Sequence, residues 1–124
     1  MYQNGYEQYK MQSVNTMTRG EMLLLLYDEI LKRLTRAEIA LEEKDYDLFD
    51  KSVVRADEIV HYLDKTLNME YEVSRDLKTM YEFFLFEISK LKAGRRVAII
   101  HELKPLVAEL RDAFREAEKT SGVS

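Results

Sequence analysis

The stretch TRGEMLLLLYDEILKRLTRAEIAL, residues 18–41, decides the fold. Thr18 followed three residues later by Glu21 forms a capping box, which is typical of a helix N-terminus. Beyond it, apolar side chains recur in steps of four and three residues, so they share one face of a helix. These positions are Leu23, Tyr27, Ile30, Leu34, Ala37 and Leu41. The stretch therefore predicts an amphipathic helix over residues 18–43.

The same spacing occurs three more times and predicts helices over residues 47–67, 74–93 and 96–119. Asn68 is a residue that can end the second helix, Ser74 is a suitable N-cap for the third, and Gly94 suits the residue after its end. The apolar positions are Phe49, Val53, Ala56, Val60, Leu63 and Leu67, then Leu77, Tyr81, Phe84, Ile88 and Leu91, then Ile100, Leu103, Val107, Leu110, Phe114 and Ala117.

Four such helices with short connections predict an all-α protein, an antiparallel four-helix bundle over residues 18–119. Residues 1–17 are expected to form a flexible N-terminal tail, and residues 120–124 a frayed C-terminus. Pro105 lies inside the last helix, where it removes a backbone hydrogen bond. We therefore expect a kink or break near residues 102–105.

The composition of the chain argues against several classes of function. The chain has 124 residues, no cysteine and a formal net charge of −4, and its basic residues are scattered, which argues against nucleic-acid binding and thiol chemistry. Residues 1–17 contain no apolar segment of a secretory signal, and the longest apolar run, residues 22–27, is too short to span a membrane. The sequence thus predicts a cytoplasmic protein with no membrane insertion.

Residues that carry chemistry are sparse. Glu58 and His61 form a Glu-x-x-His motif, but bundle metal centres use two such motifs, and Ala98 stands three residues before the second histidine, His101. The sequence also has no nucleophile elbow and no glycine-rich phosphate loop. We expect no catalytic site, metal or cofactor, and therefore no enzyme.

The third helix carries an excess of apolar residues in MYEFFLFEI, residues 80–88. On a helical wheel, Phe84 and Ile88 face the core whereas Phe83 and Phe86 fall nearly opposite. A single exposed aromatic needs no explanation, but the excess recurs on the other helices. Residues placed off the main stripes are Met22, Leu24, Leu31, Ile59, Tyr62, Ile99 and Leu106. We expect grooves for an amphipathic segment of another protein, a second copy or the chain's own tail.

The N-terminal tail has tyrosines at helical spacing, four and then three residues apart. It is either simply disordered, as termini often are, or it folds onto an apolar groove. In the second case its anchors are Tyr2, Tyr6, Tyr9, Met11 and Val14.

Three ordered segments resemble the flagellin-specific secretion chaperone family, FliS. They are YKMQSVNTMTRGEMLLLLYDEILKRLTRAEIAL (9–41), ADEIVHYLDKTLNMEYEVSRDLKTMYEFF (56–84) and ELRDAFREA (109–117). The first carries Tyr9-Lys10, Ser13-Val14, Thr16 with Glu21, and Leu26-Tyr27-Asp28. The chain departs from the family pattern at Phe114, where tryptophan is frequent, at Phe86, where a basic residue is expected, and at Pro105.

The resemblance implies a cytoplasmic chaperone that binds the disordered C-terminal segment of flagellin, prevents premature polymerisation and supports delivery to the flagellar export apparatus. It also implies that the tail can cover a groove when flagellin is absent. Together with the helical wheel, it suggests groove or tail contacts at Tyr9, Met11, Val14, Ile59, Tyr62, Phe83 and Phe86. Two alternatives stay open: a self-associating helical module, which would form a homodimer, and a metal-binding carboxylate bundle.

Overall fold

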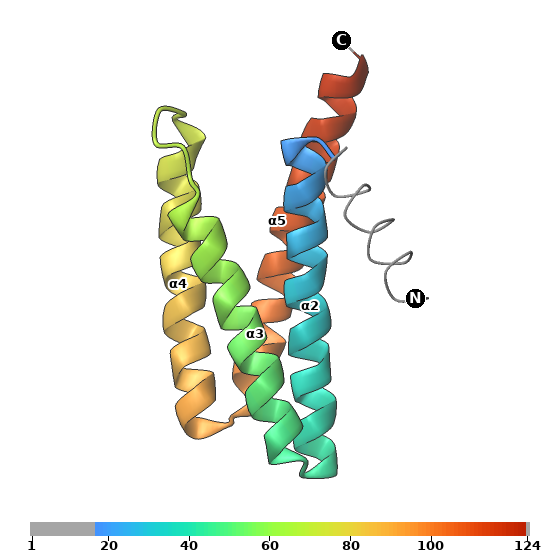
Figure 1. Cartoon of the computed structure of the whole chain (residues 1–124), viewed down its shortest axis with the longest axis vertical. Helices are drawn as coiled ribbons and strands as arrows, with labels where there is room; N and C mark the ends of the chain where they lie inside the picture. Colours follow the sequence, from blue (N-terminus) through green and yellow to red (C-terminus); the bar gives the residue numbers. More distant parts are fainter. Residues whose placement is uncertain (1–16, 124) are drawn as a thin grey trace, which may run out of the picture.

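The computed structural model describes residues 17–123, with side chains described as far as Thr120. It contains four helices: α2 (Arg19–Glu43), α3 (Tyr46–Lys65), α4 (Val73–Gly94) and α5 (Val97–Val123). They alternate in direction, with α2 packed on α3 and α5, α3 on α4, and α4 on α5 (Figure 1). The predicted all-α, antiparallel four-helix bundle is confirmed. The tail residues Tyr9, Met11 and Val14 lie outside the described residues.

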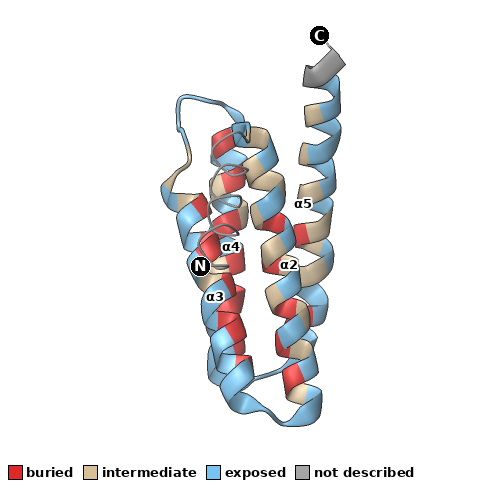
Figure 2. Ribbon diagram, turned by 45° about the vertical axis from the view of Figure 1, so that its right-hand side comes forward, coloured by how far each residue is buried: buried red, intermediate tan, exposed pale blue. Residues whose placement is uncertain are grey.

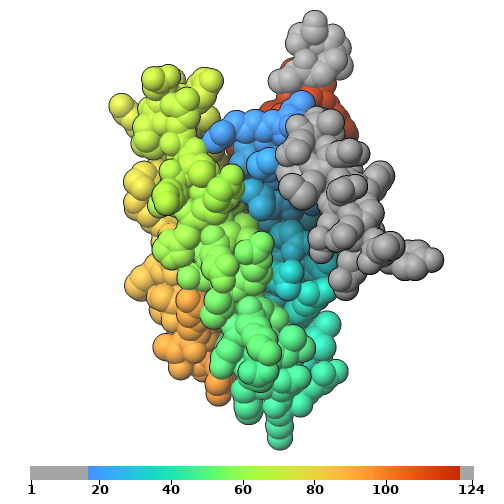
Figure 3. Space-filling model, viewed as in Figure 1, coloured from blue at the N-terminus to red at the C-terminus, as the bar shows by residue number. Residues whose placement is uncertain are grey.

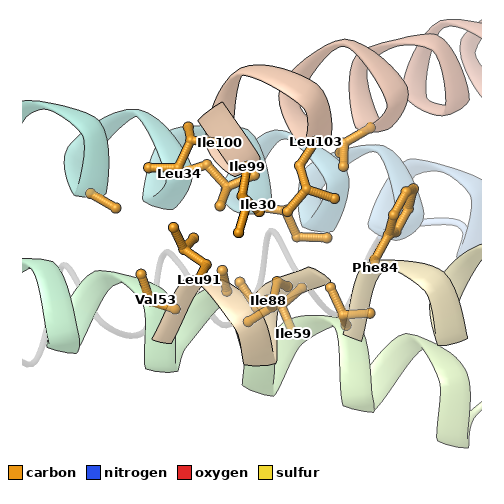
Figure 4. Packing of buried hydrophobic residues seen from close by; sticks show 14 of the residues in the cluster. Ile30, Leu34, Val53, Ile59, Phe84, Ile88, Leu91, Ile99, Ile100 and Leu103 are labelled. Atoms are coloured by element: carbon orange, nitrogen blue, oxygen red, sulfur yellow. The ribbon is translucent and has the colours of Figure 1, made fainter. Parts of the chain in front are cut away.

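The core is a single apolar cluster to which every helix contributes, and the buried positions form inward-facing stripes in Figure 2. Side chains from all four helices point toward one another in Figure 4, among them Leu34, Val53, Ile88 and Leu103. Burying aliphatic side chains of this size stabilises a fold by about 1.5–3 kcal/mol each. The core therefore holds the bundle together.

Two residues predicted to lie off the core stripes are in fact buried. Ile59 is 3% exposed and Ile99 is 4% exposed. Because α3 packs on both α2 and α4, its buried arc is wider than one stripe, and Ile59 falls within that arc. Ile99 lies beside Ile100 at the start of α5, where its side chain joins the same cluster (Figure 4).

The start of α2 follows the predicted cap, because the Glu21 amide donates to Thr18 Oγ1 at 3.1 Å. The prediction for Ser74 is wrong: α4 begins one residue earlier, and the buried Ser74 hydroxyl donates to the Asn68 backbone oxygen at 2.6 Å. Gly94 is also misplaced by one position, since the left-handed residue that follows α4 is Arg95, with φ of 52°.

Arg95 tolerates this backbone conformation because its side chain is well placed. Its guanidinium lies 4.6 Å from the centroid of the Tyr46 ring and 3.5 Å from Asp50 Oδ2. A cation over an aromatic face is worth about 0.5–1 kcal/mol at an exposed site, which offsets part of the left-handed strain. The α4–α5 turn is therefore fixed by contacts with α3 rather than by a glycine.

Helix α5 runs through Pro105 as a single helix, so the proline does not break it. Proline leaves the carbonyl four residues earlier, that of His101, without its helical N–H partner. Both Pro105 and His101 are exposed, so water can reach this part of the helix. Meanwhile Leu103 and Val107 on the opposite side remain in the core and keep the two halves of α5 in place.

Ion pairs join neighbouring helices along their exposed edges. Between α2 and α5, Glu38 lies 2.8 Å from His101 Nε2 and 3.3 Å from Lys104 Nζ, and these hydrogen bonds lower the pKa of the Glu38 carboxyl. Between α3 and α4, the Asp64 carboxylate is 3.3 Å from Lys78 Nζ and raises the pKa of that amine. Solvent screens such exposed pairs, so they help to fix helix pairing more than overall stability.

Candidate interaction surface

One end of the bundle contains a cavity of about 130 Å³. It lies where α2 begins and α3 ends, and it opens at the notch visible at the top of Figure 3. Its walls are mainly apolar and come from all four helices and the α3–α4 connection. They are Arg19, Leu23, Leu63, Thr66, Leu67, Asn68, Tyr71, Val73, Ser74, Leu77, Tyr81 and Phe114. The end cavity is therefore a place where the core is incompletely filled.

The α3–α4 connection is ordered around Asn68. Its backbone oxygen accepts hydrogen bonds from the Ser74 hydroxyl at 2.6 Å and from the Tyr71 amide at 3.2 Å. Its side-chain oxygen accepts from the Glu70 amide at 3.0 Å, as in an Asx turn. These bonds place Tyr71 and Val73, both exposed, at the rim of the end cavity.

A pair of buried tyrosines supports this end of the bundle. The hydroxyls of Tyr27 on α2 and Tyr81 on α4 are 2.5 Å apart, and the two residues are 0% and 1% exposed. Burial raises the pKa of both phenols, so both stay neutral and hydrogen-bonded at ordinary pH. The Phe114 ring lies 5.6 Å from that of Tyr27 and continues the aromatic packing toward the cavity.

Two further hollows lie between α2 and α3. The smaller, about 70 Å³, is lined by Arg19, Met22, Leu23, Leu26, Tyr62 and Thr66. The larger, about 310 Å³, is lined by Leu26, Arg55, Glu58, Ile59 and Tyr62. Leu26 and Tyr62 belong to both, so the two hollows form one groove along the α2–α3 seam.

A fourth hollow of about 390 Å³ lies between α4 and α5. Asp76 is the one charged residue in a lining made of Val73, Asp76, Leu77, Met80, Leu110, Ala113, Phe114 and Ala117. The upper part of α5 stands away from the other helices in Figure 2, which leaves these side chains incompletely covered. Of the four hollows, this one has the most apolar lining.

The four hollows adjoin one another through shared lining residues, and we call them together the apolar track. Leu23 lines both the α2–α3 groove and the end cavity, while Leu77 and Phe114 line both the cavity and the α4–α5 hollow. The track thus starts near Ile59, crosses the open end of the bundle and continues past Met80. Its form suits an extended or partly helical apolar segment better than a compact small molecule.

The predicted contact residues divide into three groups. Tyr62, which is 49% exposed, and the buried Ile59 line the track. Phe83 and Phe86 are 45% and 61% exposed, but they line none of its four hollows. Tyr9, Met11 and Val14 fall in the part of the chain that the structure does not describe.

Sequence reasoning missed the α4–α5 hollow. Leu77, Leu110 and Phe114 recur at core spacing and were placed on the core stripes, with no indication that they also line a surface hollow. A helical period shows which face is apolar but not whether the opposing helix covers it along its whole length. The clue in the sequence was the pair of alanines, Ala113 and Ala117, whose small side chains leave room on α5.

The described residues offer no evident chemical centre. Within residues 17–123, no group of three or more His, Cys, Asp or Glu side chains is placed to hold a metal ion. Glu58 and His61 are both exposed, and His61 lies 3.6 Å from Asp57. No helix in this part of the chain combines the length and apolar character needed to cross a bilayer.

Comparison with known proteins agrees with this picture. Residues 2–121 match the family model described as "Flagellar protein FliS". The chain is 31% identical over 115 residues to the "Flagellar secretion chaperone FliS" of Bacillus subtilis (strain 168), covering 93% of this chain and 86% of that protein. Its fold is similar to a structure titled "Crystal structure of flagellar chaperone from bacteria", with a TM-score of 0.80 at 17% identity, over 97% of this chain and 99% of the other. The family suggested by the three sequence segments is therefore confirmed, and the chain belongs to the FliS family of flagellar secretion chaperones.

Proposed function

We propose that this protein is a cytoplasmic, non-enzymatic export chaperone that binds the disordered C-terminal segment of flagellin along the apolar track. Bound in this way, flagellin is kept from premature polymerisation and is delivered to the flagellar export apparatus. The observation that carries the proposal is the series of adjoining, mainly apolar hollows to which all four helices contribute. The B. subtilis relative, named a flagellar secretion chaperone, supports the same role.

The physical balance suits a disordered client. Ordering a flexible segment costs about 2–5 kcal/mol or more, whereas apolar burial contributes about 25 cal/mol per Å². A long apolar track offsets the ordering cost through many modest contacts, so no single deep pocket is required. Tyr62 and Ile59 would contact the client in the α2–α3 groove, and Leu77 and Met80 in the α4–α5 hollow.

Calorimetric titration with the isolated C-terminal segment of the organism's own flagellin, at two temperatures, tests the proposal. We expect saturable one-to-one binding with a negative heat-capacity change, the signature of apolar burial. Tyr62→Asp and Ala113→Asp place a charge at the two ends of the track, and each should weaken binding by more than about tenfold.

Val54→Asp is the matched control, because Val54 is exposed on α3 but lines none of the four hollows. It should change the affinity by no more than about twofold. Absence of binding by the unmodified chain, or equal weakening by all three substitutions, would refute the assignment of the track to flagellin.

The tail is proposed to cover part of the track through Tyr9, Met11 and Val14 when the client is absent. A covered site lowers apparent affinity by the fraction of molecules in which it is open. Deleting residues 1–16, which leaves the Thr18 cap intact, should therefore tighten flagellin binding. Unchanged or weaker binding by the shortened chain would contradict a covering role.

Self-association is the second candidate, favoured by the exposure of Phe83 and Phe86 outside the track. It predicts a homodimer whose population rises with concentration and falls on Phe86→Asp. Sedimentation across a concentration series measures this directly. A chain that stays monomeric at every concentration rejects the second candidate and leaves the first unaffected.

A further inference from the structure

We propose that Arg19 is a specificity-determining residue of the track and pairs with an acidic side chain in the interior of the bound segment. The inference rests on the proposed function. Arg19 is the first residue of α2 and lines both the end cavity and the smaller α2–α3 hollow. A client that follows the track from one hollow into the next must therefore pass its guanidinium.

The Arg19 side chain is held across the track. Its Nη2 donates to the Thr66 backbone oxygen at 2.8 Å, which joins the start of α2 to the end of α3. A guanidinium has five N–H donors in a planar fork, so this bond leaves most of them available. The bond also fixes the position of the group before any client arrives, which reduces the ordering cost of pairing with it.

Arg19 forms no ion pair with a carboxylate in the described part of the chain, where the other arginine of the track does. Thr66 offers a neutral carbonyl, and the ion pairs formed within residues 17–120 by the other track cation, Arg55, use Glu58 on the same helix. Glu118 of α5 packs against Gly20, the neighbouring residue, but among the described residues it forms no ion pair with Arg19. Arg19 is exposed, so a client carboxylate can reach its guanidinium and form a charge-assisted hydrogen bond with it.

The partner chemistry follows from the setting of Arg19. Apolar residues line both hollows beside Arg19, among them Met22, Leu23, Leu26 and Leu67, together with uncharged polar residues such as Thr66 and Asn68. The matching client residue is therefore an aspartate or glutamate flanked by apolar residues. It is a side chain and not the terminal carboxylate, because the track continues on both sides of Arg19, and a chain that ended there would leave half of the track empty.

A charge exchange between chaperone and client tests this assignment. The probes are the isolated flagellin segment and a set of variants in which each aspartate or glutamate is replaced by lysine in turn. We expect one lysine variant of the segment to bind the unmodified chaperone more than about tenfold more weakly than the unmodified segment does. The same lysine variant should bind the Arg19→Glu chaperone more than about tenfold more tightly than the unmodified segment does. A crossover of this kind requires a direct pair.

Two further readouts separate pairing from a merely structural role of Arg19. If Arg19 only caps the end of α3, Arg19→Glu will weaken every segment equally and no crossover will occur, which overturns the proposal. Arg19→Gln should reduce the salt dependence of binding if a charge pair is lost, and an unchanged salt dependence also overturns it. Thermal melts of each variant establish that the bundle is intact.

Arg36→Glu is the matched control, since Arg36 is an exposed arginine of α2 that lines none of the four hollows. It should bind every segment as the unmodified chain does. Failure of this inference is distinguishable from failure of the proposed function. If the unmodified chain binds the unmodified segment but no crossover appears, the track is supported as the flagellin site and the pairing role of Arg19 is refuted. If no segment binds, both the proposed function and the role of Arg19 are refuted.

Discussion

The buried hydroxyl pair of Tyr27 and Tyr81 yields an asymmetric prediction. Removing one hydroxyl leaves the other buried without its partner, which costs about 1–3 kcal/mol. Tyr81 lines the end cavity, so in Tyr27→Phe the residue that keeps its hydroxyl lies next to a space that can hold water. Tyr27 does not line the cavity and is 0% exposed. In Tyr81→Phe the Tyr27 hydroxyl is therefore buried without a hydrogen-bond partner. We expect Tyr81→Phe to cost about 2–3 kcal/mol and Tyr27→Phe about 1 kcal/mol.

The double variant completes the cycle. Replacing both tyrosines by phenylalanine removes donor and acceptor together and leaves apolar rings of nearly the same shape, which can be almost neutral. Its loss of stability should therefore be smaller than that of Tyr81→Phe alone. Urea unfolding at pH 7 measures the free energies, with the exposed Tyr62→Phe as a control expected to stay within about 0.5 kcal/mol. A double variant as unstable as the sum of the two singles would refute the reasoning.

The same pair sets a pH dependence. Burial, the largest cause, raises the pKa of both phenols, so the folded chain keeps two protons that the unfolded chain releases near pH 10. Their contribution to stability is complete below about pH 10 and declines above it, by about 1.4 kcal/mol per pH unit for each tyrosine. The double phenylalanine variant should show a shallower loss of stability between pH 10 and pH 11. If the free energy of unfolding of the double variant falls with pH as steeply as that of the unmodified chain, the buried tyrosines do not cause this pH dependence.

Other substitutions separate the core from the surface. Phe84→Ala should cost about 3–5 kcal/mol in denaturant unfolding, whereas Phe86→Asp should stay within about 1 kcal/mol, and a melted Phe86→Asp would show that the assignment of faces on α4 is wrong. Thr18→Ala should cost about 1 kcal/mol through loss of the N-cap, and Thr18→Asp should keep the stability. Pro105→Ala should raise stability by about 1–3 kcal/mol because it restores an N–H for the His101 carbonyl; a drop in melting temperature would show that proline is needed there.

The sequence predicted what each helix could determine by itself. The spacing of apolar residues located all four helices and most of the core, because amphipathic period is a local property. The errors at Ser74 and Gly94 arose where a cap depends on contacts from elsewhere, in one case the Asn68 carbonyl and in the other Tyr46 and Asp50. Residue type alone did not reveal these partners.

The errors about the site have a different origin. Ile59 and Ile99 were placed off the core because each helix was given a single buried stripe, whereas α3 contacts two neighbours. Leu77 is buried as predicted and Phe114 packs against the core, but both also line a hollow between α4 and α5 that the stripes did not predict. Both features depend on the distances between packed helices, which are a property of the assembled bundle rather than of one helix.

The incomplete end of the bundle connects stability to function. The well-packed residues such as Leu34, Val53 and Ile100 have essentially no exposure, while the cavity and the α4–α5 hollow leave apolar walls facing space. Such walls forgo the contacts that close packing would give, so this end adds less stability than its composition allows. On the proposed function, a client segment that fills the track would supply those contacts, and a client that binds only the folded chain would stabilise the bundle by an amount that grows with the logarithm of its concentration. The unfilled core at one end is thus the same feature, seen without its client, as the binding surface we propose.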